Sequence, residues 1–145
     1  MSLIPTLLVH QYLYKNGFPK WDVYASEKTA KLKEIVKVHK ENVATAYEKG
    51  VNILMGTDSG VIPHGHNLEE LTYLVDIGMT PAEAIASGTS KAAKFLGKNN
   101  LGLIKHGKIA DLILVKGNPL DDIKLLSDND NILAVIQDGK IVKGH

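Results

Sequence analysis

The chain has 145 residues, enough for one ordinary domain with its own core. A composition of 44% hydrophobic and 23% charged residues is typical of a globular protein and argues against a disordered one. Lys and Arg together number 17 and Asp and Glu 16, so the net charge of +1 indicates no face for nucleic acid or a membrane. Cysteine is absent, and no apolar run approaches the roughly 20 residues of a membrane-spanning helix, so we expect a cytoplasmic protein.

The first fifty residues predict a strand, a loop and a long helix. Residues 3–9 (LIPTLLV) indicate a short buried strand, and residues 10–26 indicate an aromatic-rich loop that contains glycine and proline. From Ser26, a candidate cap, apolar residues recur every three or four positions until Gly50, which predicts an amphipathic helix. The aromatic side chains of the loop could line a pocket or an interface, or anchor the loop on its own helix: Tyr12, Tyr14, Phe18, Trp21 and Tyr24.

A second strand and more helices follow. The stretch VNILMG (51–56) is too short for a helix and does not alternate, which is typical of a strand covered on both faces in a parallel sheet. Strand, helix and strand together predict a βαβ unit. Residues 67–77 predict a helix that breaks at Gly78, and a new helix starts at Thr80, where TPAE contains a capping box, and ends at residues 96–97.

Beyond residue 100 the pattern becomes strand-like. LGLIKHGKIADLILVKG predicts two strands with a tight turn at residues 105–107, and NILAVIQDGKIV predicts a hairpin around Asp138-Gly139. We therefore expect an α/β part, 3–99, and a small β part, 100–143. Residues 1–2 and 144–145 are candidates for vector-derived ends, and a natural chain that opens inside a strand would be a fragment of a longer protein.

Asp58, in the stretch GTDSG after the second strand, is the main candidate for chemistry. In open α/β sheets and βα barrels the reactive side chains lie at the carboxyl ends of the strands. A carboxylate there can ligate a metal ion and accept a proton from metal-bound water. The alternative is an Asx turn, in which Asp58 only caps the loop through backbone N–H groups.

His64 and His66 form a second candidate feature. They flank Gly65 after Pro63, which predicts a loop, and a metal pair is disfavoured because a zinc site needs three or four well-placed ligands. The alternatives are two solvent-facing loop histidines ahead of a helix that Asn67 caps, and a single histidine that contacts substrate, which is favoured over a metal pair. The other histidines considered are expected in structural or turn positions: His10, His39 and His106.

Several segments, taken together, resemble the end of a metal-dependent amidohydrolase. They are GTDSG, HGHNLEELTYLVDIGMTPAEAIASGTSKAAKFLG, LGLIKHGKIADLILVKGNPLDDI and VIQDGKIV, and the resemblance covers residues 3–143. The order and spacing of GMTPAEAI and GLIKHGKIADLILVKGNPL make it specific, whereas the acid motif alone would be weak. The branch that it most resembles is the imidazolonepropionase-like and Xaa-Pro dipeptidase-like (prolidase-like) group.

The resemblance implies an α/β fold: the C-terminal part of a (β/α)₈ TIM barrel, with strands seven and eight and their helices, plus the terminal strands of a small β-sandwich. LIPTLLV resembles the seventh strand and VNILMGTD the eighth. Asp58 then matches the family's strand-eight aspartate, which is catalytic and ligates or adjoins the metal. His64 and Asn67 lie in a loop that resembles the family's substrate-binding side.

The activity implied is hydrolysis of a carbon–nitrogen bond, in a cyclic amide or a dipeptide, by metal-activated hydroxide. The implied cofactor is a divalent metal ion, with zinc the first choice. In the family, paired histidines lie on the first strand, a bridging lysine or glutamate on the fourth, and further histidines on the fifth and sixth. None of those segments is in this sequence, so His64 and His66 are not assigned as ligands.

A full barrel needs about 250 residues and zinc needs three or more protein ligands, so we expect the isolated chain to be inactive. The expected partners are a small-molecule or dipeptide substrate, the missing N-terminal part of the barrel, and further copies that bury exposed strand edges and helix faces. The alternative is a non-catalytic, self-associating structural or interaction module.

Overall fold

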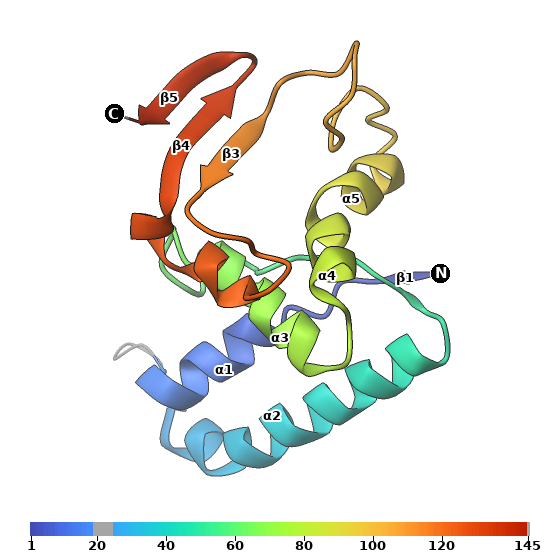
Figure 1. Cartoon of the computed structure of the whole chain (residues 1–145). Helices are drawn as coiled ribbons and strands as arrows, with labels where there is room; N and C mark the ends of the chain where they lie inside the picture. The colour runs from blue at the N-terminus through green and yellow to red at the C-terminus, as the bar shows by residue number, and fades with distance from the viewer. Residues whose placement is uncertain (19–24, 145) are drawn as a thin grey trace.

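The computed structural model describes residues 1–18 and 25–144. Two short strands, β1 (Ser2–Leu3) and β2 (Asn52–Ile53), pair in parallel, with Leu3 opposite Ile53. The ladder continues by one bond, because Leu54 donates its N–H to the carbonyl of Leu3 at 2.9 Å. Helices α1 (Leu7–Asn16) and α2 (Ala25–Glu48) lie between the two strands in the chain (Figure 1). The predicted βαβ unit is therefore confirmed.

The predicted boundaries of the first strand and loop are wrong. Pairing stops at Leu3, and the rest of LIPTLLV enters α1, which also takes up the first residues of the expected loop. Leu7 and Leu8 donate their N–H groups to Oε1 and Oε2 of Glu70, at 2.9 and 2.6 Å. A carboxylate 62 residues away thus caps a helix for which Thr6 supplies no side-chain cap. The aromatics Trp21 and Tyr24 lie outside the described residues.

The helices after β2 follow the predicted pattern. A 3₁₀ turn, η1 (Asn67–Glu69), leads into α3 (Glu70–Asp76), and the chain turns at Gly78. Helices α4 (Pro81–Gly88) and α5 (Ser90–Phe95) complete this region. The capping box is confirmed: Glu83 donates its N–H to Thr80 Oγ1 at 3.2 Å, and Glu83 Oε2 accepts the N–H of Thr80 at 3.0 Å.

The last part of the chain forms an antiparallel sheet in the order β3–β4–β5. Its strands and two 3₁₀ turns are β3 (Leu112–Val115), η2 (Ile123–Ser127), η3 (Asn129–Asn131), β4 (Ile132–Gln137) and β5 (Lys140–Gly144). The hairpin is confirmed, since Asp138 and Gly139 both have the positive φ, 49° and 74°, of a two-residue turn. One of the two strands predicted in 101–117 is absent: residues 101–110 form turns, and only the stretch from Leu112 pairs.

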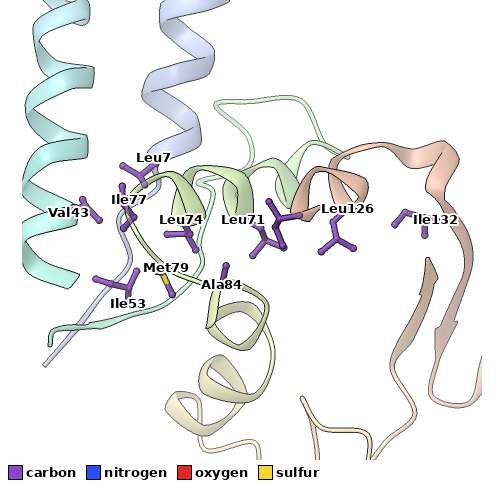
Figure 2. Close-up of a cluster of buried hydrophobic side chains, with 11 residues drawn as sticks. Leu7, Val43, Ile53, Leu71, Leu74, Ile77, Met79, Ala84, Leu126 and Ile132 are labelled. Atoms are coloured by element: carbon purple, nitrogen blue, oxygen red, sulfur yellow. The ribbon is translucent and has the colours of Figure 1, made fainter. Parts of the chain in front are cut away.

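One apolar core joins both parts of the chain (Figure 2). Leu71, Leu74 and Ile77 project from α3 and its end into the centre of this cluster. Buried side chains from β2, α2 and the C-terminal region pack in the same cluster, among them Ile53, Val43, Leu126 and Ile132. Residue 99 therefore marks a change of secondary structure within a shared core. The division of the chain into two domains at this residue stays a prediction.

Candidate functional site

Asp58 lies on the loop that leaves the carboxyl end of β2. The backbone approach there is close, because a Cβ on Gly56 would come within 2.2 Å of Ile4 Cγ2, at the end of β1. Asp58 itself has φ 49°, in the left-handed region, and its carbonyl accepts the N–H of Val61 at 3.2 Å. The loop therefore turns sharply at the residue that the sequence singles out.

The carboxylate of Asp58 is exposed to solvent and carries no hydrogen bond or ion pair within residues 1–18 and 25–144. The Asx-turn alternative requires this side chain to accept a backbone N–H, and it is the main-chain carbonyl that does so instead. The turn is closed by the backbone, and the acid group remains available to a ligand.

The loop after Asp58 carries the other predicted residues. His64 and Asn67 are exposed, and Asn67 is the first residue of η1. His66 Nδ1 lies 2.6 Å from Glu69 Oε1, which ties the second histidine to the 3₁₀ turn. Asp58 and His64 lie in the loop between β2 and η1, and no hydrogen bond joins their side chains to each other or to Asn67. Asn67 does not cap the helix, because it lies inside the 3₁₀ turn.

A groove of about 530 Å³ opens beside this loop. One wall is the C-terminal half of α1, with Tyr12, Leu13 and Asn16. The other wall is the segment 60–64, which follows Asp58 and ends at His64. Of the aromatics predicted to line a pocket or anchor the loop, Tyr12 and Phe18 do line this groove.

Glu70 is a buried acid next to this loop that the sequence analysis did not single out. Its side chain is fully buried, and burial raises the pKa of its carboxyl to about 7, against the opposing effect of the N–H groups of Leu8 and Leu7. It links α3, which follows the Asp58 loop, to the start of α1, which follows β1. A signal was present in the sequence: Glu70 shares a helical face with Leu74 and Ile77, both buried.

His10 and His39 pack against each other outside this loop. Their ring centroids are 4.8 Å apart, in an edge-to-face arrangement. Burial, and then the proximity of His10, lower the pKa of His39. Both residues are half-buried between α1 and α2, as predicted, and His106 is exposed in its turn, as predicted.

The described residues do not make a metal site by themselves. Within them, no group of three or more His, Asp or Glu side chains is placed to hold a metal ion. Asp58 is a single exposed carboxylate, whereas a zinc ion takes three or more protein ligands. A metal at this loop would therefore need ligands from elsewhere.

Comparison with known proteins places the chain in a family. Residues 3–142 match the model of the amidohydrolase family. This chain belongs to the amidohydrolase family. The resemblance inferred from the motifs is thereby confirmed, and the fold is related to the TIM-barrel α/β fold of these enzymes.

This amidohydrolase chain is similar to proteins of known structure and name. A Xaa-Pro dipeptidase with methionine bound in its active site is 39% identical, with a TM-score of 0.83, over 97% of this chain and 34% of that one. The ochratoxinase of Aspergillus niger is 33% identical over 140 residues, which are 94% of this chain and 28% of the relative. The imidazolonepropionase of Haloarcula marismortui is 29% identical over 68% of this chain and 24% of its own length.

The chain spans about a third of the length of the solved Xaa-Pro dipeptidase and ochratoxinase chains. Among the helices of residues 1–18 and 25–144, none is both long and apolar enough to cross a membrane.

Proposed function

We propose that this chain is the part of a hydrolase of carbon–nitrogen bonds that contributes Asp58 to the active site. The substrate is a cyclic amide or a dipeptide, as in prolidase-like enzymes. The observation that carries the proposal is the position of Asp58: an exposed, unpaired carboxylate on a sharp turn after a strand that pairs in parallel. Similarity over nearly the whole chain to a Xaa-Pro dipeptidase and an ochratoxinase supports it.

In this proposal β1 and β2 are the seventh and eighth strands of a (β/α)₈ barrel, and α2 is the seventh helix. Residues 3–99 form the last part of that barrel, and residues 100–143 supply terminal strands of a small β-sandwich. The parallel pairing of β1 and β2 around a helical connection supports the first assignment, and the antiparallel sheet β3–β4–β5 supports the second. A cytoplasmic location stays a prediction.

Asp58 would take the proton that the attacking water gives up and pass it to the leaving nitrogen, so that it acts as base and then as acid. Its carboxylate would also be one ligand of a divalent metal ion, zinc being the first choice, with the remaining ligands on polypeptide outside this chain. His64 and Asn67, on the same loop, would contact the substrate. The isolated chain is expected to be inactive because one ligand cannot hold the metal.

The test of the catalytic role is Asp58→Asn in the complete enzyme that contains this chain. We expect kcat for dipeptide hydrolysis to fall by about 10²- to 10⁴-fold, because the proton carrier is lost while the size of the side chain is kept. Asp76→Asn is the matched control: Asp76 is exposed on α3 and pairs with Lys40 at 3.4 Å. A near-normal rate for Asp58→Asn would reject the role.

The second candidate function is a non-catalytic module that acts by association. It is favoured by the apolar side chains that the chain exposes, such as Leu114 and Ile141, at 57% and 72% of their surface. Metal analysis of the purified chain tests an expectation that both candidates share, namely that the isolated chain binds no metal ion. Stoichiometric zinc in a well-behaved monomer would contradict both the missing-ligand argument and the module.

A further inference from the structure

The first turn of α1 lies between the main core and the loop that carries Asp58. Leu7 packs in the main core with side chains of α3 (Figure 2), whereas Leu8 and Val9 pack in a second buried cluster. The third buried member of this second cluster is Ile62, which is 2% exposed and follows Asp58 in the loop after β2. The position of the first turn of α1 therefore decides where Ile62 can be buried.

Ile62 is joined to Asp58 by a short hydrogen-bonded turn. The carbonyl of Asp58 accepts the N–H of Val61 at 3.2 Å, and the carbonyl of Ile62 accepts the N–H of Gly60 at 3.3 Å. Asp58 itself has φ 49°, a backbone conformation that a residue with a side chain seldom adopts unless its surroundings impose it. A buried side chain at one end of residues 58–62 thus limits where the carboxylate at the other end can lie.

Glu70, the first residue of α3, holds the first turn of α1 in place. Its Oε1 and Oε2 accept the N–H groups of Leu7 and Leu8 at 2.9 and 2.6 Å, and its side chain is fully buried. Thr6, at the cap position of α1, makes no side-chain hydrogen bond to the helix. Without Glu70, two buried N–H groups would lose their acceptors, so the start of the helix would shift or open.

The burial of Glu70 separates its role from that of Asp58. A side chain with no exposed surface cannot touch a substrate, and both of its oxygens already accept an N–H. Glu70 can act on a reaction only through the residues that it holds. Those residues lead in three steps to Asp58: the first turn of α1, the buried side chain of Ile62 and the turn of residues 58–62.

We propose that Glu70 is a positioning residue for Asp58. By fixing the first turn of α1 it holds Ile62, and through Ile62 it holds the turn of residues 58–62 where the carboxylate of Asp58 can reach the substrate. The inference rests on the proposed function for the role of Asp58, but the order of the turn is measured without catalysis.

The first test is a double-mutant cycle in the complete enzyme that contains this chain. Glu70→Gln keeps the size of the side chain, but the amide nitrogen cannot accept an N–H, so one bond to α1 is lost. We expect Glu70→Gln to lower kcat for dipeptide hydrolysis by about 10- to 100-fold when Asp58 is present, because a small displacement of a reacting group is costly. In the Asp58→Asn background it should lower kcat less than about twofold, because an effect that passes through the carboxylate disappears with it. A normal kcat for Glu70→Gln, or the same loss in both backgrounds, would overturn the proposal.

Glu83→Gln is the matched control, because it makes the same change at another helix start. Glu83 Oε2 accepts the N–H of Thr80 at the start of α4, at 3.0 Å. No described residue of α4 belongs to the buried cluster around Ile62. Glu83→Gln should therefore keep the kcat of the wild type. A loss as large as that of Glu70→Gln would show that any weakened helix start lowers turnover, and would refute the specific role of Glu70.

Hydrogen–deuterium exchange of the complete enzyme, followed by mass spectrometry, reports on the turn without a substrate. The peptide that contains residues 58–62 should exchange about tenfold faster in Glu70→Gln than in the wild type, and at the wild-type rate in Glu83→Gln. Ile62→Ala removes the middle step and leaves both bonds of Glu70 in place, so it should also speed this exchange, and it keeps the test decisive if Glu70→Gln unfolds. Wild-type exchange in the folded Glu70 and Ile62 variants would reject the positioning role.

Asp58→Asn separates this inference from the proposed function. Faster exchange of residues 58–62 in Glu70→Gln, together with full turnover of Asp58→Asn, would reject the proton-carrying role of Asp58 and with it the catalytic purpose of the positioning. Lost turnover of Asp58→Asn, together with unchanged exchange in Glu70→Gln, would leave the proposed function standing and reject the role of Glu70 alone.

Discussion

Two carboxylates of the same region have opposite environments. Asp58 is exposed and unpaired at the end of a strand, where a substrate can reach it. Glu70 is fully buried and accepts two backbone N–H groups at the start of α1. The first carries the proton in the proposed function, whereas the second holds together the two chain segments that leave the carboxyl ends of β1 and β2.

The buried position of Glu70 predicts a pH-dependent stability. Its folded pKa of about 7 lies above the ordinary value of 4.5, so the folded state binds the proton more tightly than the unfolded state does. The contribution of Glu70 to stability is therefore full below about pH 4.5 and is lost as the pH rises through 7. As the pH rises from 4.5 to 7, the wild type should lose up to about 3 kcal/mol of unfolding free energy that Glu70→Gln does not lose, because glutamine does not titrate.

Urea denaturation of the wild type and of Glu70→Gln from pH 4 to pH 8 checks this expectation. Glu70→Gln should be less stable than the wild type at pH 4.5, because both oxygens of the protonated acid can still accept an N–H, whereas the amide nitrogen cannot and leaves one N–H buried without a partner. The gap should narrow as the pH rises. Glu48→Gln, an exposed glutamate at the end of α2, is the control, and parallel curves for wild type and Glu70→Gln would contradict the argument.

The prediction that Asp58 lies at the end of a strand needed only local information, and its role in chemistry stays a prediction. The role of Glu70 was missed because it depends on α1, whose backbone lies more than sixty residues earlier in the chain. The helical face that Glu70 shares with Leu74 was visible in the sequence, but the partner of the buried acid was not. The place of a residue after a strand is therefore easier to predict than a buried polar contact between distant segments.

At the scale of secondary structure, the start of α4 is fixed by a capping box. Thr80 and Glu83 exchange hydrogen bonds, and Tyr47 of α2 also donates to Glu83 Oε2, at 2.9 Å. The hydroxyl and N–H of Thr80, and then Tyr47, lower the pKa of Glu83 to about 2. The contribution of the ionised box to stability is thus present above about pH 4.5 and is lost as the pH falls toward 2.

Thr80→Ala should lower the free energy of unfolding by about 1 kcal/mol at pH 7, the usual effect of removing such a cap. Thr45→Ala is the matched control, because the Thr45 hydroxyl only donates to the carbonyl of Glu41 inside α2, where alanine is a better helix former. Chemical denaturation measures both. Equal stabilities for Thr80→Ala and wild type would show that the N–H groups of α4 find other acceptors.

The elements that were predicted well are determined by residues close together in the sequence, as in the TPAE capping box and the Asp138-Gly139 hairpin. Those that were predicted badly depend on distant contacts. LIPTLLV is apolar enough for a strand or a buried helix, and the carboxylate of Glu70 stabilises the helical form. Residues 101–105 look like a strand, but Gly102 lies against the backbone of Thr89, where a Cβ would come within 2.7 Å of the carbonyl oxygen.

On the scale of the whole molecule, the structure contains a sheet arrangement that is unusual for an independent domain. Parallel sheets are normally covered on both faces and have several strands, and β1 and β2 form a pair alone among the described strands. The three-stranded sheet lies at the opposite end of the molecule from α2 (Figure 1). Both features agree with the proposed assignment of the chain to the last part of a longer barrel protein, and the chain covers 34% of the Xaa-Pro dipeptidase that it resembles.

The outer face of the three-stranded sheet is the surface where we expect copies of the chain to associate. Ile136 pairs with Leu112 on one side and Ile141 on the other, so the three side chains form one row across the sheet. Leu114, two residues along β3, lies on the same face, whereas Val135, on the opposite face, packs against the core. Association through the edge of β5 is disfavoured by its lysines, which are charges of the kind that protect edge strands.

Sedimentation velocity over a range of concentrations tests this association. The wild-type chain should sediment faster as its concentration rises, and the double variant Leu114→Lys, Ile141→Lys should remain a monomer, because two charges on the apolar face cannot be buried against a second copy. The control is Leu96→Lys, Ile104→Lys, which changes two exposed apolar residues outside the sheet by the same charge and should associate like the wild type. A wild-type chain that stays monomeric at high concentration would reject the prediction, and association that disappears only in the control would move the interface away from the sheet.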